Sequence, residues 1–336
     1  MKNLTKTFTL SLVIMTVLCL SGGENTYAQS VEMQQFKDIK AKADKGDIEA
    51  QCWLASCYNV GLFGCKIDKD QARELFQKVA KHANDNLAAV QHSKGVCYKN
   101  GYGVAKDLVE ATKWFRKAAD QGYASAQNSL GGCYRKGEGG VPQDDQKALE
   151  WYRKAADQGF AMAQNNIGGF YREGRVVKQS DEKAFEWFRK AADQGHAGGR
   201  CNLGNYYYDA WGVPQNYPEA VKWYTLAANQ GHAYAQFYLG ICYAHGWGFP
   251  KKNPTEAVKW YTLAANQKFA EAQYNLGACY YNGEGVSKNI SVAKSWFEKA
   301  AANGLAEAKQ VLDEWDTRWV RSSTDLPSIL RTLSLP

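Results

Sequence analysis

The chain has 336 residues, 45% of them hydrophobic and 22% charged, and its formal net charge is +7. Its lysines and arginines form no basic run or nucleic-acid motif, so we interpret them as a solvated surface and expect no nucleic-acid partner. Tryptophan and tyrosine are abundant, at 11 and 20 residues. Most of them recur at a fixed spacing, which argues against an ordinary globular enzyme.

Residues 1–28 are predicted to be a secretory signal peptide. A basic start precedes an apolar run from Phe8 to Leu20, and Ala28 provides the small residue expected before a cleavage site. The apolar run is short for a membrane span, and Leu18 stands where a lipoprotein signal needs a small residue. We therefore expect an exported protein, periplasmic or secreted, with no stable membrane span after processing.

Residues 29–46 are predicted to form an N-terminal capping helix in front of a repeat array over residues 47–304. Within the array a tryptophan returns at intervals of 36 or 37 residues, and Leu-Gly-x-x-Tyr or a close variant stands about twenty residues before it. Such a period is typical of stacked helical repeats. The six tryptophans are Trp114, Trp151, Trp187, Trp223, Trp260 and Trp296.

One repeat, residues 123–159, illustrates the predicted unit of two helices. Helix A is expected to end at Gly137, and helix B to begin after an N-cap at Asp144 and to end at Gly159. We expect the tryptophan of helix B to fill the space between helices. Six clear units follow a degenerate unit at residues 47–86, in which Phe76 replaces the tryptophan. Residues 305–336 are predicted to hold a C-terminal capping helix and a tail.

These motifs resemble the Sel1-like repeat family, a relative of the tetratricopeptide repeats. The resemblance rests on Leu-Gly-x-x-Tyr, on Gly-x-Gly-Val at residues 101–104 and 283–286, and on Trp-[Tyr/Phe]-x-Lys-Ala-Ala-x-Gln-Gly. It covers nearly all of residues 47–304; Ala210 and Lys268 depart from it where glycine is usual. The resemblance implies an all-α fold, a right-handed α/α superhelical solenoid of about seven helix-turn-helix repeats. It also implies a protein-interaction scaffold, here an exported bacterial member.

The positions of helix A that vary between repeats suggest a binding surface. Positions equivalent to 128, 132 and 135 share one helix face, and by analogy with tetratricopeptide superhelices this stripe lines the concave side. Arg135 and Arg172 are expected to pair with carboxylates of a peptide or of a partner's helix. The expected apolar anchors are Tyr208, Phe237, Tyr274 and Tyr281. The alternative is that Phe237 and Tyr274 pack between repeats.

Two tryptophans of neighbouring repeats, Trp211 and Trp247, fall in the loops between helices A and B. Exposed tryptophans of this kind form a small protein-interaction patch. The alternative interpretation is that they cover the ends of the adjacent helices.

The sequence predicts a non-enzymatic protein without cofactor or metal. The five histidines have no metal-ligand spacing, and the Gly-x-Gly turns are helix stops, not phosphate loops. Ser291 and Lys294 fit a Ser-x-x-Lys motif, which keeps cell-wall or β-lactam binding or hydrolysis open as an alternative, because some cysteine-rich family members carry that label. The accompanying Ser-Asp-Asn and Lys-Thr-Gly motifs are missing. A secreted effector that meets host proteins is a further alternative.

Eight cysteines follow the predicted signal peptide. Most of them occupy equivalent helix A positions, and such positions in stacked repeats are too far apart for a disulfide. We interpret most as small buried apolar residues, and Cys57 with Cys65 is the one local pair for which a disulfide stays open. The eight are Cys52, Cys57, Cys65, Cys97, Cys133, Cys201, Cys242 and Cys279.

Overall fold

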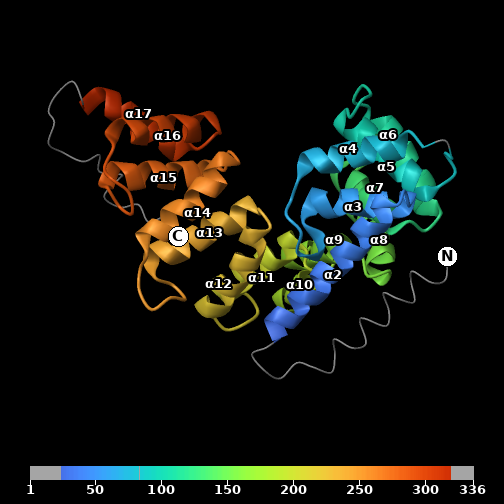
Figure 1. Ribbon diagram of the computed structural model, residues 1–336, viewed down its shortest axis with the longest axis horizontal. Helices are drawn as coiled ribbons and strands as arrows, with labels where there is room; N and C mark the ends of the chain where they lie inside the picture. The colour runs from blue at the N-terminus through green and yellow to red at the C-terminus, as the bar shows by residue number, and fades with distance from the viewer. Residues whose placement is uncertain (1–23, 83, 319–336) are drawn as a thin grey trace.

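The computed structural model describes residues 24–82 and 84–318, and within these ranges the chain forms helices joined by turns (Figure 1). The predicted signal peptide up to residue 23 and the predicted tail beyond residue 318 lie outside the described residues. The helices are α2 (Glu24–Asp44), α3 (Ile48–Val60), the 3-10 turn η1 (Leu62–Gly64), α4 (Lys69–Ala80), α5 (Ala88–Asn100), α6 (Leu108–Asp120), α7 (Ala124–Lys136), α8 (Asp145–Asp157), α9 (Ala161–Glu173), α10 (Asp181–Asp193), α11 (Ala197–Asp209), α12 (Tyr217–Asn229), α13 (Ala233–His245), α14 (Pro254–Asn266), α15 (Ala270–Asn282), α16 (Ile290–Ala302) and α17 (Ala306–Arg318).

Local signals define where the helices begin and end. The Asp144 carboxylate accepts the Lys147 N–H at 2.9 Å, as predicted for the N-cap of a helix B. Helix A of the same repeat ends at Gly137, whose φ of 65° is left-handed. Ala210 and Lys268 take the same left-handed conformation without being glycine, with φ of 61° and 65°. The turns therefore keep their geometry where the sequence departs from the repeat pattern.

The core of each repeat is built on the aromatic residue that follows the tryptophan. Five of the six repeated tryptophans are only half-buried, and the prediction that tryptophan fills the space between the helices is wrong. The side chain of the residue after each tryptophan fills this space, because it points from helix B toward helix A. The buried residues are Phe115, Tyr152, Phe188, Tyr224, Tyr261 and Phe297.

Glycine in helix A makes room for this ring. A Cβ atom added to Gly168 would lie 2.7 Å from the ring of Phe188, and one added to Gly204 would lie 2.5 Å from the ring of Tyr224. The glycine of Leu-Gly-x-x-Tyr is therefore a packing requirement, since no other side chain fits between the helices. The tryptophans lie further out, where lysines cover them; Lys154 Nζ stands 4.0 Å from the centre of the Trp151 ring.

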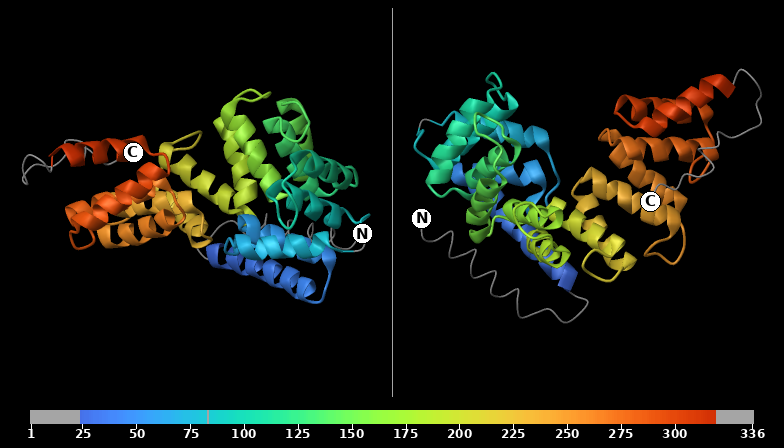
Figure 2. Two further views of the ribbon diagram at one scale, coloured as in Figure 1. Left: turned by 90° about the horizontal axis from the view of Figure 1, so that it is seen from above. Right: turned by 180° about the vertical axis from the view of Figure 1, so that it is seen from behind.

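The N-terminal repeats curve into a ring, so that residues of the first repeat contact residues of the fourth and fifth repeats. α2 lies along α3 (Figure 2), and the turn η1 reaches the fourth and fifth repeats. The Ile67 N–H donates to the Gln230 carbonyl at 2.9 Å, and the Gln230 amide donates to the Gly61 carbonyl at 2.6 Å. The helices from α12 onward extend away from this ring as an arm (Figure 1).

A buried ion pair joins α2 to α11 at this closure. Arg200 Nη2 lies 2.6 and 2.5 Å from the two carboxylate oxygens of Glu32, and both side chains are about 95% buried, with exposures of 4% and 5%. Arg200 also donates to the Gln230 side chain at 2.9 Å. We call this set of contacts between Glu32, η1, Arg200 and Gln230 the clasp.

Candidate functional site

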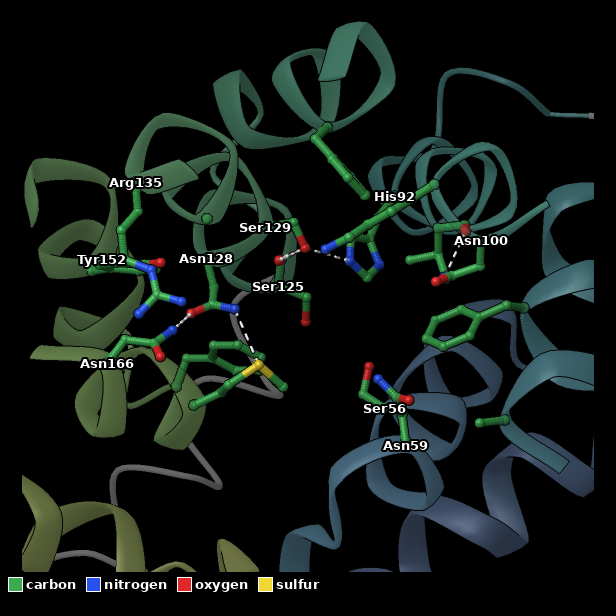
Figure 3. Close-up of a pocket in the computed structure, with 18 of the residues that line it drawn as sticks. Ser56, Asn59, His92, Asn100, Ser125, Asn128, Ser129, Arg135, Tyr152 and Asn166 are labelled. Carbon is green, nitrogen blue, oxygen red and sulfur yellow. Dashed lines mark hydrogen bonds between the residues drawn. The ribbon is translucent and has the colours of Figure 1, made fainter. Parts of the chain in front are cut away.

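A cavity of about 500 Å³ opens inside the ring, where the concave faces of α3, α5, α7 and α9 meet (Figure 3). Its volume falls in the range of protein ligand pockets, about 300–1,000 Å³. We call it the N-terminal cavity. Its lining includes Ser56, Asn59, Lys69, His92, Val96, Lys99, Asn100, Tyr102, Ser125, Asn128, Ser129, Gly132, Arg135, Lys136, Tyr152, Phe160, Met162 and Asn166.

The contacts that close the ring also form one side of the cavity. Trp53 of α3 packs edge-on against Phe160, which begins α9, with ring centres 5.8 Å apart. Residues of α3 and η1 share a buried apolar cluster with Ala161 and Ala191 of the fourth repeat. The cavity is therefore bounded by repeats far apart in the sequence.

The wall between α7 and α9 is polar and ordered by hydrogen bonds. Asn166 donates to the Asn128 amide oxygen at 2.8 Å, and the Asn128 nitrogen lies 3.1 Å from Met162 Sδ. Figure 3 shows Asn128 and Asn166 side by side with Arg135 above them. Amides, hydroxyls and cations alternate here, so the wall offers both donors and acceptors to a ligand.

His92 of α5 lies at the back of the cavity. Burial, with a smaller effect of Lys99, lowers the pKa of His92 to about 3. The imidazole is therefore neutral at physiological pH, where Nε2 lies 3.3 Å from Ser129 Oγ and Nδ1 lies 3.6 Å from Cys52 Sγ. His92 shapes the cavity without contributing to its charge.

The structure separates the two predicted arginines. Arg135 is half-buried and lines the cavity. Arg172, at the equivalent position of the next repeat, is not among the lining residues; it pairs with Glu173 at 3.3 Å and lies over the Phe188 ring. Of the two, Arg135 is the one that can meet a ligand in this cavity.

Three of the four predicted aromatic anchors belong to the core. Tyr208, Phe237 and Tyr274 are 7%, 5% and 0% exposed. Tyr208 is enclosed by other rings, with Tyr238 and Trp247 both within 5.6 Å of its centre. Their side chains hold neighbouring repeats together, so the expectation that they anchor a partner is corrected.

The other predicted aromatics lie at the surface, away from the cavity. Tyr281 is half-buried against Trp315 of α17, with ring centres 5.5 Å apart. Trp247 stacks on Tyr217 at 5.4 Å and covers the end of a neighbouring helix. Trp211 is 41% exposed while its ring meets Tyr206 edge-on. Their roles in binding stay predictions.

The structure also shows where the residues considered for catalysis, disulfide formation and metal binding lie. Ser291 lies in the first turn of α16, where its hydroxyl bonds the Asn289 side chain at 2.9 Å, outside the cavity. Cys57 and Cys65 are buried free thiols; the Cys65 Sγ donates to the Cys57 carbonyl at 3.2 Å. In the described part of the chain, no three His, Cys, Asp or Glu side chains converge as metal ligands. No helix described there is long and apolar enough for a membrane span.

Comparison with known families identifies the architecture. The model of the Sel1 repeat matches residues 48–84, 86–123, 124–160, 161–196, 198–232, 233–269 and 270–305. The chain belongs to the Sel1 repeat family. The predicted all-α solenoid of about seven helix-turn-helix repeats is thereby confirmed, including the degenerate first unit.

Solved structures agree with this assignment. A Sel1 repeat protein from Oxalobacter formigenes is 31% identical, with a TM-score of 0.59 over 69% of this chain and 92% of its own. A protective antigen of uropathogenic Escherichia coli strains, described as displaying an SLR fold, is 32% identical, with a TM-score of 0.57 over 86% of this chain and 68% of its own.

Two curated relatives come from yeasts. The chitin synthase regulator SKT5 of Saccharomyces cerevisiae is 32% identical over 37% of this chain and 18% of its own length. Chitin synthase regulatory factor 3 of Schizosaccharomyces pombe is 27% identical over 29% of this chain and 14% of its own. The chain thus spans less than a fifth of the length of either relative.

These relatives contradict the prediction of an exported, periplasmic or secreted protein, because their names describe regulators of a chitin synthase. In the structure α2 begins at Glu24 and continues unbroken through Ala28 to Asp44, so the expected cleavage point lies inside the first of the described helices. The same helix carries Glu32 of the clasp.

Proposed function

We propose that this protein is a non-enzymatic scaffold that binds a segment of a partner protein in the N-terminal cavity, on the concave side of the repeats. The observation that carries the proposal is the cavity itself. The A helices α3, α5 and α7 present variable positions to one concave space of about 500 Å³, and residues of α9 complete its lining together with the core rings of Phe76, Phe115 and Tyr152.

The family and its relatives support a role through binding. Sel1 repeats form solenoids, whose concave surfaces suit extended partners. The yeast relatives are named as regulators of another enzyme, which favours action on a partner protein over catalysis by the repeats. No partner identity is carried over, because the matched segment is a small part of those chains.

Filling the cavity should abolish partner capture. Gly132 lines the cavity, and the nearest atom to a Cβ placed there is the Tyr152 hydroxyl, at 3.8 Å. Gly132→Trp is expected to project an indole into the space and to weaken partner binding at least about tenfold. The measurement is affinity capture with quantitative mass spectrometry, comparing this variant with the unchanged protein.

The matched control is Arg153→Trp, an indole on the exposed face of α8 outside the cavity. It should capture the same proteins as the unchanged chain. Equal capture by a folded Gly132→Trp variant would refute the cavity as the binding site.

A further inference from the structure

The N-terminal cavity selects its occupant by charge. We propose that it takes an extended acidic segment of the partner protein, two of whose carboxylates pair with Lys99 and Arg135. The proposal rests on the proposed function and adds the chemistry of the bound segment.

The charged side chains that line the cavity are all cationic. Lys69, Lys99, Arg135 and Lys136 contribute to it, and Asp and Glu are absent from the described residues that line it. Elsewhere on the surface, cations commonly stand beside carboxylates; for example, Lys113 pairs with Glu110 at 3.1 Å. The cavity therefore concentrates one sign of charge in a concave space, which attracts an anionic ligand.

Lys99 and Arg135 are the two cations best placed to meet that ligand. Both are half-buried, and within the described ranges neither makes an ion pair. In contrast, Lys69 donates to the Asn59 side chain at 3.0 Å, and Lys136 has Glu138 at 3.7 Å. A half-buried guanidinium offers two parallel donors that match a carboxylate.

The spacing of these two cations suits an extended chain. They occupy the same helix A position in consecutive repeats, and equivalent points on stacked helices are about 10 Å apart. An extended chain in the polyproline II conformation rises about 3.1 Å per residue with three residues per turn, so side chains three residues apart lie on one face. Acidic side chains three residues apart therefore reach both cations at once.

The polar wall fits the main chain of such a segment. Asn59, Asn100, Ser125 and Asn128 line the same cavity as the cations, and an extended main chain offers one donor and one acceptor per residue. A bound helix would satisfy those groups internally and leave the polar wall unused. We therefore assign an extended segment and not a helix.

The test is selection of peptides on the full chain. A library of random dodecapeptides displayed on phage is selected on the immobilised protein, and enriched sequences are compared for Asp and Glu content. We expect pairs of acidic residues about three positions apart, and synthetic versions should lose at least about tenfold in affinity for Lys99→Glu/Arg135→Glu.

The control variant, Arg153→Glu/Lys309→Glu, carries the same charge change at two exposed positions outside the cavity and should bind the selected peptides normally. Lys99→Gln/Arg135→Gln replaces the charge reversal if circular dichroism shows that the reversal unfolds the chain. Enrichment of neutral or basic peptides, or acidic peptides bound equally by the cavity variant, overturns the acidic-segment inference alone. No enrichment, or cavity-dependent binding of a single-stranded oligonucleotide instead, overturns the proposed function as well.

Discussion

Replacing Arg200 by methionine is expected to destabilise the fold by about 3–5 kcal/mol, the usual cost of removing one partner from a buried ion pair. The substitution leaves the Glu32 carboxylate inside the protein, with 5% exposure and without its two hydrogen bonds to the guanidinium. Gln230 loses its bond to Arg200 as well. Urea unfolding followed by circular dichroism measures the loss at pH 7.

The titration of Glu32 determines how the stability loss of Arg200→Met changes with pH. Burial raises the pKa of Glu32 even with Arg200 present, which opposes that rise. Without Arg200 the pKa rises further, so the folded state gains a proton more readily than the unfolded state. Stability linked to this carboxyl is retained at low pH and lost as pH rises through its folded pKa. The defect of Arg200→Met should therefore shrink from pH 7 to pH 5.

Glu32→Leu/Arg200→Met is the matched control, because it removes both charges and fills their space with apolar side chains. It should recover much of the lost stability. If the free energy of unfolding of Arg200→Met lies within about 0.5 kcal/mol of that of the unchanged protein, the ion pair of the clasp does not stabilise the fold.

Phe188→Ala should be equally damaging, by about 3–5 kcal/mol, because it removes a large buried ring from the core of its repeat. Phe188 is 1% exposed and contacts Gly168 and Tyr206. Trp187→Ala, one residue earlier, should cost less than half as much, since that side chain is half-buried. Thermal and urea unfolding of both variants test the ranking.

Gly168→Ala probes the same contact from the opposite side. The added Cβ lies 2.7 Å from the Phe188 ring, and overpacking of this kind costs about 1–3 kcal/mol, partly offset by the better helix propensity of alanine. Combined with Phe188→Ala, the new methyl group enters vacated space, so the double variant should be more stable than the sum of the single losses predicts.

A Trp187→Ala defect larger than that of Phe188→Ala would contradict this account of the core.

The sequence predicts the repeats well because their signals are local. Period, glycine stops and the Asp144 cap depend on neighbours within one unit, and each appears where expected. Burial is harder to predict, since Trp151 and Tyr152 are adjacent on a broad helix face. The structure distinguishes them through Gly131, where an added Cβ atom would lie 2.8 Å from the Tyr152 ring.

The candidate site is less predictable because it depends on curvature. The variable stripe includes Arg135, which lines the cavity, but it also selects Tyr208, Phe237 and Tyr274, whose side chains are buried between repeats. The clasp joins Glu32 to Arg200 across 168 residues. No repeat pattern encodes such a contact, which joins the N-terminal helix to the fifth repeat.

Site-specific photo-cross-linking tests the central claim most directly. A photoreactive benzoylphenylalanine replaces Asn100, an exposed residue that lines the N-terminal cavity, or Arg153, an exposed residue outside it. Irradiation of the full chain in native extract should link a partner at position 100 and not at position 153, and Lys99→Glu should weaken that product. Linkage at position 153 alone, or at both positions equally, would contradict binding in the cavity.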